Sequence, residues 1–398
     1  MKNLLFLAHR MPYPPNKGDK IRSYQLLRYL SQFFRISLGA FVDDKADWRY
    51  QRELDQYCAD VFLLPLRPRM ATFACLQGFF RGEPLTLGYY RSRAMTEWVK
   101  SKVEGGIQII LAFSSSMAQY AEPFRGDKVR RYIDFVDLDS EKWTQYGARK
   151  RRPMKSIYLR EGRLLARYEC RVAREFDGAA LISSGEARPL INRCPEVESR
   201  VHFISNGVDH GYFDASLSFD NPYPPANDVI VFTGAMDYWA NVDAVLWFSR
   251  EVWPKIRSEH PKSIFFIVGA RPTRAVRALG GIAGIHVTGT VADVRPYLRH
   301  ATLAVAPMRI ARGIQNKILE AISMQLPVVA TSAAVENLRG GTMSCVRVAD
   351  QVVSFAAAVG RVLQDPQAEC TSGAGAHHVR REYSWDNNLR DFLLLLSE

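Results

Sequence analysis

One segment near the C-terminus carries residues that could bind an anion and a pair of hydroxyl groups. It reads Arg309-Ile310-Ala311-Arg312-Gly313-Ile314-Gln315-Asn316-Lys317-Ile318-Leu319-Glu320. Gly313 lets backbone amides approach a ligand closely, and a helix beginning near Gln315 points its positive end at the same place. Arg312 and Lys317 add cations, and Glu320 follows about one helical turn later, where its carboxylate can accept hydrogen bonds from a sugar diol. The pattern predicts a site for a nucleoside diphosphate.

Further candidate residues follow apolar runs in the same half of the chain. The runs 229–233, 264–268 and 285–288 are each followed directly by glycine, and polar side chains come soon afterwards. In open parallel sheets ligands bind at the carboxyl ends of strands, because helix N-termini and free amides collect there. Asp237 and Asn241 either bind sugar or cap the helix entered near Val242. Arg271 either reaches a phosphate or lies on the surface.

The elements that must position these residues alternate between strand and helix. We expect buried strands at 4–8, 36–41, 61–65, 107–113, 129–135, 178–183, 229–233, 264–268, 285–288, 303–306 and 328–330. Helical patterns lie between them, beginning near Ser23 and covering 155–176, 244–256 and 317–324. Such alternation predicts an α/β protein with parallel sheets covered on both faces. With 398 residues, two doubly wound domains are the economical arrangement.

Two segments of the N-terminal half carry polar residues after strands. Gly18 belongs to Pro12-Tyr13-Pro14-Pro15-Asn16-Lys17-Gly18-Asp19, where it either faces a donor phosphate or makes a turn. Asp137 belongs to Asp134-Phe135-Val136-Asp137-Leu138-Asp139, where an acceptor-side base or a helix cap is expected. His9 also follows a strand, and a loop histidine with satisfied hydrogen bonds is the simpler interpretation.

These segments together resemble the retaining family 4 glycosyltransferases, which have the GT-B fold. Residues 316–331 resemble that family's donor-binding helix and the strand after it. The segments 206–209, 231–237, 288–294 and 383–385 resemble its interdomain element, phosphate loop, nucleobase loop and terminal crossing segment. The N-terminal segments containing Gly18 and Asp137 resemble sugar transferases associated with exopolysaccharide gene clusters.

The resemblance implies two Rossmann-like domains facing a central cleft. Residues 1–205 would form the acceptor-side domain, 206–380 the donor domain, and 381–398 a helix crossing back. The implied catalytic residues are Lys317, Glu320 and Asp137. The implied donor-binding residues are Gly18, Gly234, Asp237, Asn241, Arg271, Val291, Arg312, Gly313, Gln315, Asn316, Lys317 and Glu320.

The implied reaction moves a sugar from a UDP- or GDP-linked donor to a glycan or lipid-linked acceptor, with retention of configuration. No cofactor or metal ion is expected, since no Asp-x-Asp triplet occurs in the C-terminal half. Two departures from the family stand out. Arg312 occupies the position of the first of two glutamates, which puts sugar recognition in doubt. Ala235 and Asn241 stand near the positions of the family's Arg and Lys.

Charge is uneven along the chain. Residues 1–200 hold 35 Lys and Arg against 23 Asp and Glu, whereas residues 201–398 hold 18 of each. The densest patch, Arg149-Lys150-Arg151-Arg152, is by itself most simply a solvated face. An anionic membrane surface is a candidate partner for the basic half, and nucleic acid is not expected because few aromatic residues accompany the cations. The short apolar start and six scattered cysteines indicate a cytoplasmic chain without a disulfide framework, peripheral to the membrane if it binds there.

Two alternatives to this reaction remain open from the sequence. The first is another GT-B enzyme, such as a nucleotide-sugar epimerase or a phosphorylase. The second is a non-catalytic protein that binds membranes or nucleic acid through its basic half. A nicotinamide-dependent dehydrogenase is disfavoured, because no Gly-x-Gly-x-x-Gly follows the first strand.

Overall fold

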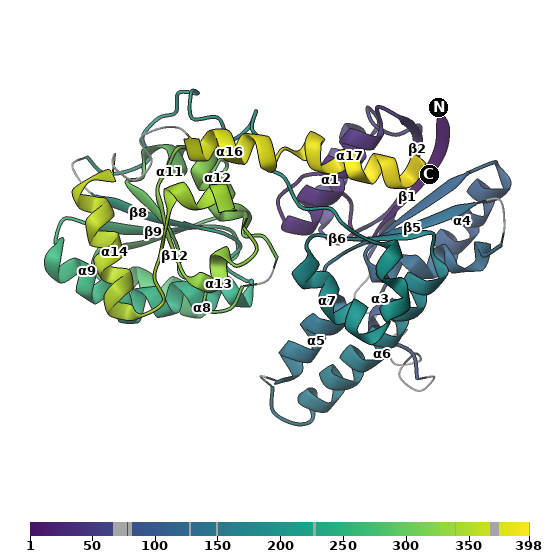
Figure 1. The fold of residues 1–398 in the computed structure, drawn as a ribbon, viewed down its shortest axis with the longest axis horizontal. Coiled ribbons are helices and arrows are strands. Elements are labelled where there is room, and N and C mark those ends of the chain that lie inside the picture. The colour runs from purple at the N-terminus through teal and green to yellow at the C-terminus, as the bar shows by residue number, and fades with distance from the viewer. Residues whose placement is uncertain are drawn as a thin grey trace. The chain divides into compact units, whose positions relative to one another are not determined.

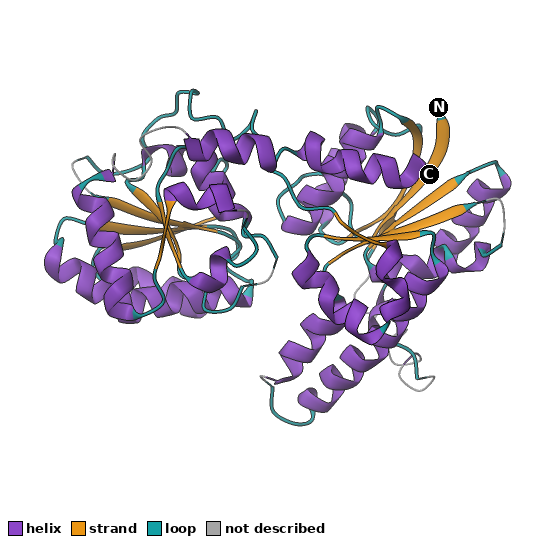
Figure 2. Ribbon diagram, in the orientation of Figure 1, coloured by secondary structure: helices purple, strands orange, loops and turns teal. Residues whose placement is uncertain are grey.

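The chain forms two compact units. The computed structural model describes residues 1–66, 78, 82–126, 129–148, 150–225, 228–311, 313–338, 340–366 and 374–397. The first unit consists of Met1–Ser205 and Leu389–Glu398, and the second of Asn206–Asn388. Each unit is built around one parallel sheet with helices on both faces (Figures 1 and 2). The predicted α/β class is therefore confirmed.

The first unit contains a seven-stranded sheet in the order β3-β2-β1-β4-β5-β6-β7. Its strands are β1 (Lys2–Ala8), β2 (Phe34–Val42), β3 (Asp60–Pro65), β4 (Ile109–Phe113), β5 (Arg130–Val136), β6 (Gly178–Leu181) and β7 (Val201–Phe203). The helices are α1 (Gly18–Leu30), α3 (Leu85–Tyr89), α4 (Arg93–Glu104), α5 (Asp139–Ala148), α6 (Met154–Glu175), α7 (Ser184–Arg193) and α17 (Trp385–Ser397), with 3₁₀ turns η1 (Lys45–Leu54), η2 (Ser115–Tyr120), η3 (Glu122–Phe124) and η4 (Pro195–Arg200).

The second unit contains a six-stranded sheet in the order β10-β9-β8-β11-β12-β13. Its strands are β8 (Val229–Thr233), β9 (Ile264–Val268), β10 (Ile285–Gly289), β11 (Leu303–Ala306), β12 (Val328–Ala330) and β13 (Val346–Val348). Its helical segments are α8 (Trp239–Trp247), η5 (Phe248–Val252), α9 (Trp253–Glu259), α10 (Arg274–Ala278), η6 (Leu279–Gly281), α11 (Arg295–His300), α12 (Asn316–Ser323), α13 (Ser332–Val335), η7 (Gly340–Cys345), α14 (Val352–Gln364) and α16 (Ala374–Glu382).

In both sheets the order in which the chain adds strands reverses at a central pair of strands. The chain winds outward from β1 to β3 and then restarts at β4 on the other side of β1. The second unit repeats this order, with β8 and β11 as the central neighbours. The loops after these paired strands turn to opposite faces of the sheet, which leaves a crevice at their carboxyl ends. Each unit therefore has one place where its topology favours a ligand.

The central strands are apolar because helices cover both faces of each sheet. Residues 4–8 of β1 and all five residues of β8 are buried. Strands of this kind consist of continuous apolar runs, which is why the sequence located them well. The long helix α6 buries Leu165 and Val172 against the first sheet, while α12 buries Ile318, Leu319 and Ile322 against the second.

Three features differ from the sequence-based expectations. Helix α1 begins at Gly18, five residues before the expected start at Ser23, so its first turn includes Asp19 and the buried Lys20. The three-residue strands β7 and β13 were not expected. Cys170 and Cys194 form a disulfide between α6 and the end of α7, although their spacing gave no sign of it. None of the described helices is long and apolar enough to cross a membrane.

Candidate functional site

Most of the predicted donor residues follow the two central strands of the second unit. Gly234, Asp237 and Asn241 come after β8. Gly313 to Glu320 come after β11, which pairs with β8 in parallel. Arg312 lies outside the described residues. The topology thus places two stretches that are 70 residues or more apart in sequence at one end of the sheet.

Two glycines allow close packing at the carboxyl ends of β8 and β9. Gly234 has a φ of +154° and Gly269 a φ of +159°, values that favour glycine. A Cβ on Gly234 would lie 2.7 Å from Nδ2 of Asn241, and a Cβ on Gly269 would overlap the carbonyl oxygen of Gly234. Side chains are therefore excluded from both positions. The ends of β8 and β9 and the side chain of Asn241 therefore pack closely together.

Asn241 connects the segment after β8 with the segment after β11. Its Nδ2 donates a hydrogen bond to the carbonyl oxygen of Ala235 at 3.0 Å. Its Oδ1 accepts a hydrogen bond from Nζ of Lys317 at 3.2 Å. The same Nζ lies 3.4 Å from Oε1 of Gln315 and 5.4 Å from the ring centroid of Phe232. Four of the predicted donor residues, including Gly234, are thus brought together.

Helix α12 places Lys317 and Glu320 on the same side, away from the core. The positions between and beside them, Ile318, Leu319 and Ala321, are buried against the sheet. The helix ends at Met324, because Gln325 adopts a left-handed φ of +57° and Pro327 cannot continue it. Lys317 lies in the first turn, where the unsatisfied amides of the helix also point.

Lys317 and Glu320 form a coupled pair with opposite pKa shifts. Burial lowers the pKa of Lys317 to about 8, although the charge of Glu320 opposes the shift. Burial likewise raises the pKa of Glu320 to about 7, against the charge of Lys317. The carboxylate of Glu320 makes no hydrogen bond to another described residue, whereas its carbonyl oxygen accepts one from the amide of Met324. A half-buried carboxylate and ammonium whose desolvation is not fully offset by hydrogen bonds are typical of ligand-binding sites.

Further polar groups lie in the loop before α12 and at the first residue of that helix. Gly313 has a φ of +59°, and its carbonyl oxygen accepts a hydrogen bond from Nδ2 of Asn337 at 3.3 Å. Oδ1 of Asn316 is inaccessible to solvent and has no hydrogen-bond partner among the described residues. Asn337 was not expected from the sequence, where nothing distinguished it from other surface residues near a short helix.

Two of the predicted residues pair with each other. Nε of Arg271 lies 2.5 Å from Oδ2 of Asp237, and about half of each side chain is exposed. Arg271 also has a left-handed φ of +53°. Arg309 forms a similar exposed pair with Asp243 at 2.6 Å. These arginines stand at the rim of the strand ends, where their charge is already balanced by a carboxylate.

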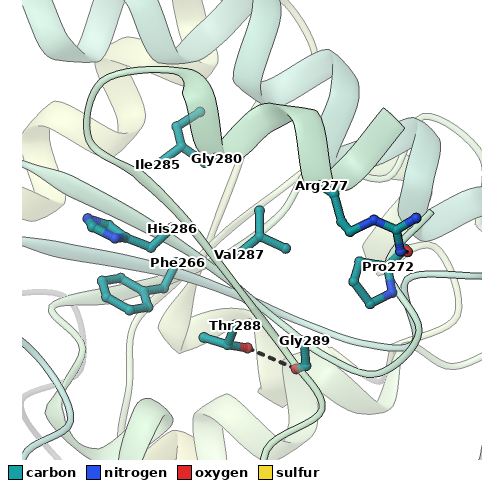
Figure 3. A pocket seen from close by; sticks show the side chains of 9 residues that line it. All are labelled: Phe266, Pro272, Arg277, Gly280, Ile285, His286, Val287, Thr288 and Gly289. Atoms are coloured by element: carbon teal, nitrogen blue, oxygen red, sulfur yellow. Dashed lines mark hydrogen bonds between the residues drawn. The ribbon is translucent and has the colours of Figure 1, made fainter. Parts of the chain in front are cut away.

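Val291 lies in a hollow beside β10. The hollow has a volume of about 530 Å³ and is also lined by Thr290, Asp293 and Tyr297. A second hollow, of about 700 Å³, surrounds the end of β10, with Arg277 and Pro272 on one side (Figure 3). Both include Thr288, so both adjoin the loop 288–294 predicted to hold a nucleobase. Lys317 and Glu320 line neither of them.

A charged network follows β1 and β2 in the first unit. Oδ2 of Asp19 accepts hydrogen bonds from Arg10 at 2.5 Å and from Nε2 of His9 at 3.1 Å. Asp43 binds Arg10 at 3.1 Å and Lys17 at 3.0 Å. Burial would favour protonated Asp19, but His9 and Arg10 hold the pKa of Asp19 well below its usual range. The predicted Gly18 is exposed beside this network, with open space where a Cβ would stand.

Strained backbone marks the ends of β4 and β5. Ser114 and Val136 have φ values of +74° and +67°, which are rare for any residue other than glycine and rarest for a β-branched one. The predicted Asp137 follows directly and pairs with Nζ of Lys142 at 2.5 Å. Asp139 begins α5 and accepts a hydrogen bond from Ser115 at 2.6 Å. Such strain is concentrated at functional sites.

Asp134, in contrast, belongs to the core of the first unit. Its Oδ2 accepts a hydrogen bond from Nε of the fully buried Arg22 at 2.7 Å. Arg22 also donates to the carbonyl oxygen of Ile204 at 2.8 Å, which ties α1 to the end of the unit. His9 packs face to face on Phe113, with ring centroids 5.8 Å apart. The described residues contain no group of three His, Cys, Asp or Glu side chains that could hold a metal ion.

Comparison with known proteins identifies the second unit. Residues 227–365 match the family model described as Glycosyl transferases group 1. Nothing among the curated proteins matches the chain by sequence.

The whole chain is similar in structure to several solved glycosyltransferases. HepE (Alr3699) from Anabaena, solved in complex with UDP, has a TM-score of 0.68 and 15% identity, with full coverage of both chains. Sucrose-phosphate synthase from Thermosynechococcus elongatus has the same TM-score and identity, covering 99% of this chain and 98% of its own. WaaG, a glycosyltransferase involved in lipopolysaccharide biosynthesis, has a TM-score of 0.66 and 15% identity, covering 98% and 99%.

These matches confirm the predicted fold and enzyme class. The chain has the GT-B fold, and its second unit carries the glycosyl transferases group 1 domain. The assignment as a glycosyltransferase rests on this domain, which covers residues 227–365.

Proposed function

We propose that this glycosyltransferase takes a sugar from a UDP- or GDP-linked donor and adds it to a glycan or lipid-linked acceptor of a cell-surface polysaccharide. The observation that carries the proposal is the coupled pair Lys317 and Glu320 at the start of α12. The pair lies where the topology of the second unit favours a ligand. HepE, a structural neighbour, was solved with UDP and with UDP-glucose.

In this proposal the first turn of α12 binds the diphosphate. Nζ of Lys317 is held by Asn241 and Gln315 and faces the end of the helix whose amides are unsatisfied. Breaking the anomeric bond leaves its electron pair on the β-phosphate oxygen, so negative charge grows there in the transition state. A fixed ammonium and oriented amides stabilise that charge without rearranging. One such contact contributes about 1.5–3 kcal/mol.

Glu320 has a different role, because its carboxylate accepts hydrogen bonds. Two adjacent ribose hydroxyls can both donate to one carboxylate. The raised pKa of Glu320 means that burial disfavours its ionised form in the free enzyme. Two donated hydrogen bonds and a protonated Lys317 would offset that free-energy cost. Gly234 and Gly269 let the ends of β8 and β9 pack closely against each other and against Asn241, which binds Lys317.

The network in the first unit is the proposed acceptor side. Asp137 and the carboxylates Asp19 and Asp43 lie at the ends of β5, β1 and β2, around the point where that sheet changes direction. Gly18 is the first residue of the 13-residue helix α1, and the amide of Lys20 in its first turn donates a hydrogen bond to Oδ1 of Asp19. Attack by the acceptor hydroxyl on the face that the leaving group occupies would retain configuration, with Lys317 rather than a divalent metal balancing the charge.

A transfer assay with a panel of donors tests the proposal directly. The purified chain is incubated with UDP- and GDP-linked sugars, with and without oligosaccharide and polyprenyl-phosphate-linked acceptors, and products are identified by mass spectrometry. We expect glycosylated acceptor with one donor. We also expect UDP or GDP to raise the melting temperature, because a ligand that binds only the folded state stabilises it. Interconversion of the donor sugar without acceptor would indicate an epimerase. No thermal shift and no transfer with any donor would contradict the proposal.

A further inference from the structure

The hairpin formed by α5 and α6 carries a continuous stretch of positive charge. Residues 142–160 contain seven Lys and Arg residues and no Asp or Glu. The stretch begins in α5 at Lys142, which pairs with Asp137 and Asp139, and ends within the first two turns of α6. A solvated surface usually mixes both signs of charge. Nineteen residues without a carboxylate therefore indicate a surface that meets an anionic partner.

The hairpin is a rigid arm rather than a loose loop. A Cβ on Gly147 would lie 3.0 Å from Leu159, and a Cβ on Gly162 would crowd Ser140 and Thr144. The two helices can pack this closely only because glycine stands at both contacts. In Figure 1 the pair extends away from the sheet of the first unit. Its tip can therefore reach a partner without unfolding other elements.

The tip combines exposed cations with an exposed apolar side chain. Residues 150–156 are all exposed, and 41% of Met154 is accessible to solvent. Lys150, Arg151, Arg152 and Lys155 form no ion pair with a described carboxylate. Cations alone would bind any polyanion. An apolar side chain among them adds binding free energy only when the partner also offers apolar groups in which it can be buried, as a lipid bilayer does.

Three aromatic residues lie behind the tip. The ring of Trp143 is 5.2 Å from that of Tyr158 and 6.0 Å from that of Tyr146, measured between centroids. Tyr158 is four residues after Met154, about 6 Å farther along the axis of α6. This distance is comparable with the thickness of one lipid headgroup layer, roughly 5–7 Å. Half-buried Trp and Tyr side chains are favoured at the membrane–water interface. Because these rings pack on one another, they are poorly placed to stack on nucleobases.

We propose that the tip of the α5–α6 hairpin docks the enzyme on an anionic membrane surface, with Met154 inserted among the lipids. The inference rests on the proposed function in one respect, since a lipid-linked acceptor gives the docking its purpose. The cations would contact phosphate and carboxylate headgroups, and the aromatic side chains would settle at their level. Nucleic acid and acidic proteins are the alternative partners that the experiment must separate.

Vesicle flotation of the full-length chain tests this docking. Vesicles of phosphatidylcholine alone are compared with vesicles containing about 30 mol% phosphatidylglycerol, at low and high salt. The hairpin variant replaces Lys150, Arg151, Arg152 and Lys155 by alanine. The matched control replaces four exposed cations elsewhere in the first unit by alanine: Arg35, Lys45, Arg52 and Arg188. A third variant, Met154→Ser, keeps every cation, adds no charge and removes the apolar contact.

The wild type and the matched control should float with the anionic vesicles at low salt and not with the neutral ones. The hairpin variant should bind the anionic vesicles at least roughly tenfold more weakly, because each cation near an anionic surface contributes to the binding free energy. Met154→Ser should weaken vesicle binding while leaving binding to an RNA oligonucleotide unchanged, because it changes no charge. Equal flotation of the wild type and the hairpin variant, or equal binding to neutral vesicles, would overturn the inference. So would strong RNA binding without vesicle binding. The thermal shift with UDP or GDP should persist in every variant, so failure of the docking is distinguishable from failure of the donor site.

Discussion

Replacing Lys317 by methionine should stabilise the free enzyme and, at the same time, weaken its hold on a nucleoside diphosphate. Methionine has a similar length and no charge. The pKa of Lys317 falls from 10.5 to about 8 because burial disfavours the ammonium. Folding therefore opposes its charged form by roughly 3 kcal/mol at neutral pH. The variant loses the hydrogen bond to Asn241, which costs about 1 kcal/mol.

The net effect should be a gain of about 2 kcal/mol, or roughly 4–8 °C in the melting temperature of a unit of this size. The affinity for UDP or GDP should fall by roughly 10- to 150-fold, because one charge-assisted contact is lost. The extra negative charge that develops on the β-phosphate in the transition state is present in the free diphosphate but not in the intact donor. Turnover should therefore fall by a similar factor, whereas affinity for the donor should fall by less. Differential scanning fluorimetry, isothermal titration calorimetry and steady-state kinetics measure the three quantities.

The dependence on pH follows from the same shift. Between pH 8 and 10.5 the unfolded chain binds a proton that the folded chain has released, so the stability of the wild type should rise with pH in that window. The variant should lack this rise. Lys262→Met, at an exposed lysine of the same unit, is the control and should change neither stability nor affinity. A Lys317→Met enzyme that is less stable than the wild type, yet binds the diphosphate equally well, would refute the reasoning and make Lys317 a structural residue.

Three further substitutions test other parts of the account. Glu320→Gln should raise the donor KM about tenfold and abolish the fall in stability between pH 4.5 and about 7, where the folded chain binds the proton that the unfolded chain has lost; an unchanged KM would remove Glu320 from the donor site. Gly269→Ala should disrupt the strand ends and yield little folded protein, whereas Gly281→Ala, with open space around its Cβ, should match the wild type in urea melts. Arg22→Met should cost about 3–5 kcal/mol, because Asp134 would remain charged in the core; a loss below about 1 kcal/mol would show that the pair is not needed.

The sequence predicted the strands of both sheets well because these are continuous apolar runs. The core strands β1, β8 and β9 lie within two residues of their expected ranges. The edge strands β7 and β13 have only three residues each and partly exposed patterns, so no periodicity revealed them. Helix α1 was expected to start too late, since Pro14, Pro15 and Gly18 are typical of loops and concealed its first turn.

The candidate site was predictable only where its residues are close in sequence. Gly313, Lys317 and Glu320 share one loop and helix, so their spacing indicated a common site. The hydrogen bond between Lys317 and Asn241 joins residues 76 positions apart and depends on the pairing of β8 with β11. The network of Arg10, Asp19 and Asp43 likewise forms through the pairing of β1 with β2, which no local pattern encodes.

A crystal structure of the enzyme with UDP or GDP tests the central claim most directly. We expect the diphosphate within hydrogen-bond distance of Nζ of Lys317 and of the amides at the start of α12, with the ribose hydroxyls on the carboxylate of Glu320. A well-ordered nucleotide bound elsewhere, with Lys317 still hydrogen-bonded only to Asn241 and Gln315, would contradict the account.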